Sequence, residues 1–159
     1  MIPRALAVRD SQHDGMCQAG IVTEALTARS VVECYIDALN RHDWTGVETL
    51  VSPGYVHHGN AHDFTFAEFR ARTSWLMNGI HDLHLETLAV VSDGGDVAVR
   101  WVARGVHNGS LNGERPTSRS VLFPGISMFH VENGHVVEDW QTFDERHLFV
   151  QLSPFATLE

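Results

Sequence analysis

The chain has 159 residues, enough for one domain with a sizeable core but short for two. Its formal net charge is −9, from 11 Lys and Arg against 20 Asp and Glu. Such a surface repels phosphate backbones and anionic lipid, so we expect neither nucleic acid nor a membrane as partner. No apolar stretch reaches the length of a membrane span, and the N-terminus lacks the plan of a signal peptide. We therefore expect a cytoplasmic protein.

The first half of the chain predicts a tail and three helices. Residues 1–25 mix small, polar and charged side chains without a clear period, which predicts a flexible tail before a single domain at 26–159. Apolar residues then recur at helical spacing, which predicts helices over Val31–Leu39, Val47–Val51 and Thr65–Met77.

The second half predicts strands, because the apolar period changes from helical spacing to two. A short extended piece over Tyr55–His58 precedes four long strands, which we expect at Ile80–Val91, Val97–His107, Arg119–Val131 and His135–Phe143. Helices followed by an antiparallel meander indicate the α+β class, with the helices on one side of the sheet.

A sheet of this length must curve, because a flat one would expose an apolar face. Pro124-Gly125, inside the third long strand, suits a bend or bulge there. A curved antiparallel sheet wrapped by N-terminal helices makes a cone around one pocket, which suits an apolar small molecule.

Several motifs occur together in a characteristic order. They are Tyr55-x-x-His58, the strand end Arg104-Gly105-Val106-His107-Asn108-Gly109, Pro116-Thr117, the run Glu138-Asp139-Trp140, Asp144 and Gln151-Leu152. Together they resemble the SnoaL-like polyketide cyclases, over about Val31 to Leu152. Val106, Ser118 and Ser153 depart from the family pattern, where Thr, Gly and Gly stand, and these departures leave the substrate open.

The resemblance implies a cone of the nuclear-transport-factor-like type. It also implies intramolecular aldol ring closure on a hydrophobic keto substrate, without a cofactor. It nominates Asp144 as the acid/base and His130 as the paired pocket histidine. Aldol chemistry needs a base at a carbon-bound proton and a donor to the enolate oxygen.

Whether His130 and Asp144 share a face depends on the turn before the last strand. A two-residue Asn133-Gly134 hairpin pairs Glu132 with His135 and puts residues 130 and 144 on opposite faces. A three-residue Glu132-Asn133-Gly134 loop, with Gly134 left-handed, puts both on the cavity side. We prefer the second register, which brings Glu138, Trp140 and Met128 to the same face.

The substrate-binding candidates are His107, Trp140, Met128, His58 and Glu138. Each has a plainer alternative: His107 can bond the backbone of the loop that follows it, Glu138 can be a surface residue and Trp140 can be core. Asp144 can likewise be a solvated or capping residue. The scattered histidines lack ligand spacing that we would assign to a metal, so we expect neither metal nor cofactor.

Two rival functions remain open. The same cone could serve a hydrolase, an isomerase or a hydroxylase, or it could be a ligand-binding and association module without catalysis. A pocket filled by its own side chains would favour the module. Long sheet faces seldom stay bare, so we expect a homo-oligomer, a dimer or tetramer, formed through the sheet.

Overall fold

The computed structural model of the chain describes residues 27–59 and 62–152, so the tail predicted at 1–25 lies outside the described residues. The elements in chain order are α1 (Ala28–Asn40), α2 (Trp44–Leu50), β1 (Val51–His58), β2 (Asp63–Thr65), α3 (Phe66–Gly79), β3 (Ile80–Asp93), β4 (Asp96–His107), β5 (Ser120–Glu132), β6 (His135–Phe143) and α4 (Glu145–Leu152). In the described part of the chain, no helix is long and apolar enough to cross a membrane.

The three predicted helices are confirmed, and their starts have clear local causes. The Thr27 hydroxyl accepts from the backbone N–H of Ser30 and caps α1, whose apolar stripe is buried. Thr65 and Glu68 form a reciprocal capping box at the start of α3. Their boundaries differ from the predicted ranges by one to three residues, which is usual for helix termini. Val51, predicted as the last residue of the second helix, begins β1 instead, and Thr65 is the N-cap of α3.

The six strands form one sheet in the order β2-β1-β6-β5-β4-β3. The predicted antiparallel meander of β3 to β6 is confirmed. Three features were not predicted: β1 is a full strand that pairs parallel to β6, β2 pairs antiparallel to β1, and α4 follows β6. Pro53-Gly54 obscures β1 in the sequence, because these residues read as a stop rather than as a strand interior.

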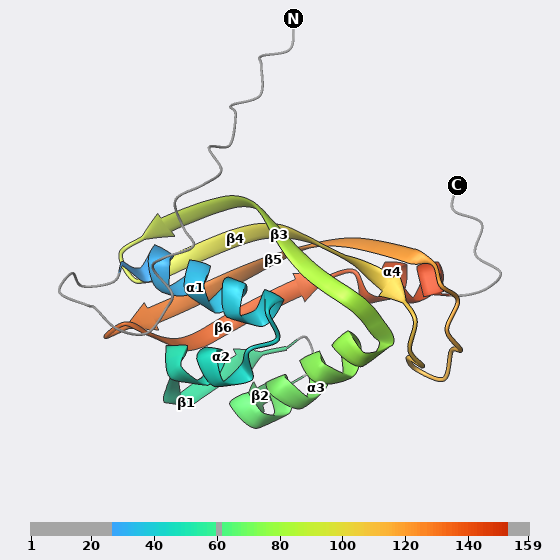
Figure 1. Cartoon of the computed structure of the whole chain (residues 1–159). Coiled ribbons are helices and arrows are strands. Elements are labelled where there is room, and N and C mark those ends of the chain that lie inside the picture. Colours follow the sequence, from blue (N-terminus) through green and yellow to red (C-terminus); the bar gives the residue numbers. More distant parts are fainter. Residues whose placement is uncertain (1–26, 60–61, 153–159) are drawn as a thin grey trace, which may run out of the picture.

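The sheet curves over the helices and makes a cone that is open at one end (Figure 1). Helices α1, α2 and α3 lie on the concave side, so the core forms between α1 and the inward-facing residues of the strands. Strand β5 alternates strictly, with odd-numbered residues buried and most even-numbered ones exposed. Val31 and Val32 of α1 and Phe129 of β5 belong to this core.

Gly125 has a packing role rather than the bulge that its Pro-Gly sequence suggests. The pairing of β4 with β5 continues without a shift through Pro124 and Gly125, so no bulge separates these strands. A Cβ at Gly125 would collide with the indole ring of Trp101, which is buried opposite it. The ring is fixed there, because its Nε1–H donates to the Ser127 hydroxyl at 3.0 Å. Glycine at 125 therefore makes the room that Trp101 needs.

We expect Gly125→Ala to lower the free energy of unfolding by about 1–3 kcal/mol, because the added methyl group overpacks the Trp101 site. Gly54→Ala is the matched control: it also lies in a strand, and a Cβ there meets nothing within 4 Å. Urea unfolding of both variants measures the difference. Equal stability of the two variants would show that Trp101 shifts freely and that the close contact is unimportant.

Candidate functional site

The turn between β5 and β6 has two residues, so the three-residue loop that we preferred is wrong. Asn133 and Gly134 both have positive φ, of 50° and 77°, and Glu132 pairs with His135. The register then shifts, because Val131 pairs with Val136 but His130 pairs with Glu138. Val137 is thus an extra residue in β6, a bulge that moves every later side chain of the strand to the other face.

The bulge gives Met128, His130, Glu138 and Trp140 a common face, as predicted, but this face is the outer side of the sheet. Met128 is 44% and Trp140 39% exposed, whereas Ser127 and Phe129 point into the core. The prediction that this face lines the cavity is wrong. The alternation in β5 is regular, but both of its faces carry large apolar residues, so the sequence pattern does not show which face is inside.

Asp144 and His130 do not meet. Asp144 is the exposed residue before α4, where its Oδ1 accepts from the backbone N–H of His147 at 2.8 Å. His130 lies on the outer face, with Asp96 at 2.6 Å and Glu132 at 3.3 Å. The prediction that both side chains point into one cavity is therefore wrong, and the capping alternative describes Asp144.

His58 forms a cluster on the outer face with two other candidates. Its ring stacks on Trp140 with centroids 4.6 Å apart, and its Nε2 lies 2.9 Å from Glu138. Its Nδ1 lies 2.9 Å from Asp63 of β2. Hydrogen bonding to Glu138, and then to Asp63, raises the pKa of His58. The imidazole thus links β2 to β6 across β1 and is not at a cavity entrance.

His107 is completely buried and organises the loop after β4. Its Nδ1 lies 3.0 Å from the Thr117 hydroxyl, and its backbone carbonyl accepts from the N–H groups of Thr117 and Ser118. It is not among the residues that line the described cavities. The alternative of a loop-bonding histidine is the one that the structure supports.

The cavity lies on the inner side of the sheet and is not filled by the protein's own side chains. It has a volume of about 260 Å³ between α3, α4 and the β1–β6 pair, and its lining includes His57, Phe69, Arg72, Leu76, Gln141 and Phe143. A second cavity of about 160 Å³ shares His57, Arg72, Gln141, Phe143 and Glu145 with it. Helix α3 lines this cavity with several of its side chains, whereas Met128 and Trp140 do not line it.

A third and smaller cavity of about 50 Å³ extends the site toward the core. Its walls are mostly apolar, with Leu39 from α1, Leu83 and Leu85 from β3, and Trp101 from β4. It shares Phe69, Leu76 and Gln141 with the main cavity. The site therefore runs from a polar mouth, where Arg72 pairs with Glu145, to an apolar inner end.

A histidine and a carboxylate are brought together at the wall of the main cavity. His57 and Asp139 are paired residues on the parallel strands β1 and β6, and they are 5% and 3% exposed. His57 Nδ1 lies 3.0 Å from Oδ1 and 3.1 Å from Oδ2 of Asp139. The Tyr55 hydroxyl donates to Oδ1 at 2.5 Å. Asp139 is thus satisfied by two donors away from water.

This arrangement fixes the form of the imidazole. A carboxylate at Nδ1 favours the tautomer that carries its proton there, which leaves the Nε2 lone pair free. Nε2 makes no hydrogen bond to the described residues, and His57 lines the two larger cavities. Burial, and then the nearby charge of Asp139, raises the pKa of the Tyr35 hydroxyl. Burial also raises the pKa of Tyr55, so Tyr55 stays protonated and remains a donor to Asp139.

Comparison with known proteins agrees with this architecture. The profile of the family described as SnoaL-like polyketide cyclase matches residues 29–152. The chain belongs to this family. A comparison with curated proteins gave no match.

Two solved structures from Streptomyces are similar to this SnoaL-like chain. AclR of Streptomyces galilaeus, named as a candidate hydroxylase, is 26% identical with a TM-score of 0.74, over 79% of this chain and 94% of AclR. IdmH of Streptomyces antibioticus, named as a candidate polyketide cyclase, is 25% identical with a TM-score of 0.73, over 80% of this chain and 99% of IdmH. A SnoaL-like protein from Jannaschia, 18% identical with a TM-score of 0.74 over 85% of this chain and 99% of its own, shares the fold.

Sequence reasoning missed the inner-face residues of this SnoaL-like site. Tyr55 and His57 are two residues apart on β1, and Asp139 and Gln141 are two residues apart on β6. Residues at this spacing lie on the same face of a strand. That pattern was available, but the parallel pairing that joins the two strands was not. Among the described residues, no group of three His, Cys, Asp or Glu side chains is arranged to hold a metal ion.

The His58 cluster predicts a pH-dependent contribution to stability. Because the folded-state pKa of His58 is raised above 6.5, its contribution is fully present below pH 6.5 and is lost as the pH rises through the folded value. We expect His58→Gln to cost most stability just below pH 6.5, with the difference from the parent narrowing as the pH rises through the raised pKa of the folded state. Urea unfolding across this range measures it.

His147→Gln is the control, since the His147 ring makes no hydrogen bond to the described residues. Its difference from the parent should stay flat over the same range. A flat difference for His58→Gln as well would show that its two carboxylate contacts do not hold the charged imidazole.

Proposed function

We propose that this protein is a cofactor-independent enzyme that removes a proton α to a carbonyl of a hydrophobic keto compound and closes a ring by an intramolecular aldol reaction. The observation that carries the proposal is the buried His57–Asp139 pair at the wall of an unfilled cavity. An imidazole with its second nitrogen directed to a cavity is the general base that such chemistry requires. His57 replaces Asp144 in this role.

In this mechanism, His57 Nε2 takes the proton from the α-carbon, and the electron pair of the C–H bond forms the enolate. The enolate carbon attacks a second carbonyl of the same molecule, which forms the new C–C bond and an alkoxide. The imidazolium returns its proton to that alkoxide. Asp139 stabilises the imidazolium between the two transfers, and Tyr55 keeps Asp139 hydrogen-bonded throughout.

The cavity walls support a hydrophobic, folded substrate. Phe69, Leu76 and Phe143 line the main cavity and continue to the apolar inner end. Apolar walls exclude water and strengthen electrostatic effects around His57. They also hold a flexible chain compact, so that its two reacting carbons are close before the bond forms.

The cavity also bears on the two alternative functions, a non-catalytic binding module and an enzyme with another reaction. A non-catalytic module would more naturally fill this space with its own side chains, which is not the case here. Hydroxylation stays the closest rival within enzymes, because AclR, named as a candidate hydroxylase, shares 26% of the sequence.

We predict that His57→Gln lowers catalysed proton exchange by roughly two to four orders of magnitude, the usual range for losing a general base. The probe is 2-tetralone, a hydrophobic ketone, and the measurement is deuterium uptake at its α-carbon by NMR. Asp144→Asn is the control: Asn still caps α4, so exchange should continue at the parental rate. Two results would contradict the proposal. In one, the parent protein exchanges deuterium no faster than buffer does; in the other, Asp144→Asn loses exchange while His57→Gln keeps it.

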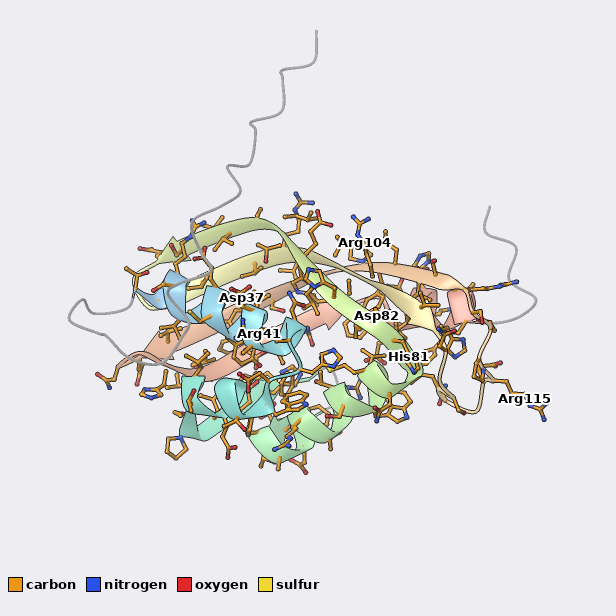
Figure 2. All side chains as sticks on the ribbon, viewed as in Figure 1. Asp37, Arg41, His81, Asp82, Arg104 and Arg115 are labelled. Carbon is orange, nitrogen blue, oxygen red and sulfur yellow. The ribbon has the colours of Figure 1, made fainter. Side chains whose placement is uncertain are left out.

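We also propose that two copies associate through the outer face of the sheet. Leu122, Ile126, Met128 and Trp140 form an exposed apolar strip along β5 and β6. Arg100 and Arg104 flank it on β4, and Glu138 flanks it on β6; Figure 2 shows Arg104 on the side of the sheet away from the helices. A two-fold axis that lies in the plane of this face would bring the apolar strips of the two copies against each other.

Ile126→Glu should convert this dimer into a monomer, because it places a charge at the centre of the apolar strip. Val150→Glu is the control: Val150 is similarly exposed but lies on α4. Sedimentation velocity reports the mass of each. A parent that is monomeric, or an Ile126→Glu variant with the mass of the parent dimer, would rule out this interface.

A further inference from the structure

Gln141 is a polar side chain in the cavity that nothing in the fold employs. It lies on β6 two residues after Asp139, on the same inner face, and it lines all three of the neighbouring cavities described above. Its side-chain amide makes no hydrogen bond to any residue that the structure describes. Gln151 offers a contrast, since its amide bonds both the N–H and the C=O of Leu122 at 3.0 Å. Gln151 is therefore structural, whereas the Gln141 side chain faces the cavity.

The position of Gln141 relative to the base is set by the strand pairing. His57 is the partner of Asp139 on the adjacent strand, so Gln141 is the next inward-facing residue along β6 from the base's own carboxylate. His57 and Gln141 both line the two larger cavities. A substrate that presents its α-carbon to His57 Nε2 therefore has its carbonyl in the space that Gln141 also faces.

Removing an α-proton moves negative charge onto the carbonyl oxygen, and this oxygen needs a donor. We propose that the Gln141 side-chain N–H donates to the enolate oxygen, which makes Gln141 the oxyanion-binding catalytic residue. The proposal rests on the proposed function, since His57 is the base that creates the enolate. A neutral amide suits this role: it cannot take the proton from His57, and it keeps its donor at every pH where the protein folds.

Other polar groups in the cavity fit the role less well. Arg72 pairs with Glu145, and both side chains are more than 40% exposed at the mouth. An enolate at the mouth would compete with the Glu145 carboxylate and with water for the Arg72 guanidinium. Of the three cavities described above, Asn112 lines only the main one, and it lies in the loop after β4. Gln141 lies on β6 two residues from Asp139, the strand partner of His57. The pairing of the strands therefore fixes the position of this donor relative to the base.

The first test is Gln141→Leu, assayed by deuterium uptake into 2-tetralone. We expect kcat to fall by roughly 100- to 1,000-fold, the loss typical of one oxyanion donor, while KM changes little. Thr142→Val is the matched control, because Thr142 is the next residue of β6 and faces the opposite side of the sheet. It should retain the parental kcat. Gln141→Met serves if the Leu variant does not fold.

The second test separates this proposal from the base assignment. Bound 4-nitrophenol, whose absorbance distinguishes phenol from phenolate, should be more ionised in the parent than in Gln141→Leu, since the amide stabilises the oxyanion. His57→Gln should lose exchange yet still favour the phenolate over Gln141→Leu. If His57→Gln keeps its exchange activity, the proposed base is wrong. If Gln141→Leu keeps both the parental kcat and the parental phenolate fraction, the donor role is wrong.

Discussion

The buried carboxylate of Asp139 constrains the rest of this structure. A carboxylate with 3% exposure is costly unless it is hydrogen-bonded, and the Tyr55 hydroxyl and the His57 imidazole satisfy it. Both partners come from β1, which lies directly beside β6 and pairs with it in parallel. Among the described strands this is the one parallel pair, and it brings Asp139 against His57 at the wall of the main cavity.

The bulge at Val137 decides which residues of β6 reach that wall. Without the extra residue, Glu138 and Trp140 would face the helices and Asp139 would face solvent. With it, the inner face carries Asp139 and Gln141, and the outer face carries the apolar strip and the His58 cluster. One inserted residue thus places the proposed catalytic residues on one side of the sheet and the proposed association surface on the other.

The sequence predicted the fold because periodicity and turn chemistry are local signals. The Val31–Leu39 helical stripe and the meander after Ile80 needed no long-range information, and both are confirmed. The site depended on two features that local signals do not carry: the parallel pairing of β1 with β6, and the bulge beyond a two-residue turn. Asp144 was placed at a strand end because α4 was not predicted, although Asp before a helix is an ordinary cap.

We propose that Asp139 holds the His57 ring with a proton on Nδ1 and with Nε2 toward the cavity. Long-range proton–nitrogen NMR of the histidine rings tests it directly, because the chemical shifts of Nδ1 and Nε2 identify the protonated nitrogen. We expect a protonated Nδ1 and an unprotonated Nε2 for His57 in the parent, and loss of this preference in Asp139→Ala. A His57 ring with its proton on Nε2 in the parent would overturn the assignment of His57 as the base, since no lone pair would then face the cavity.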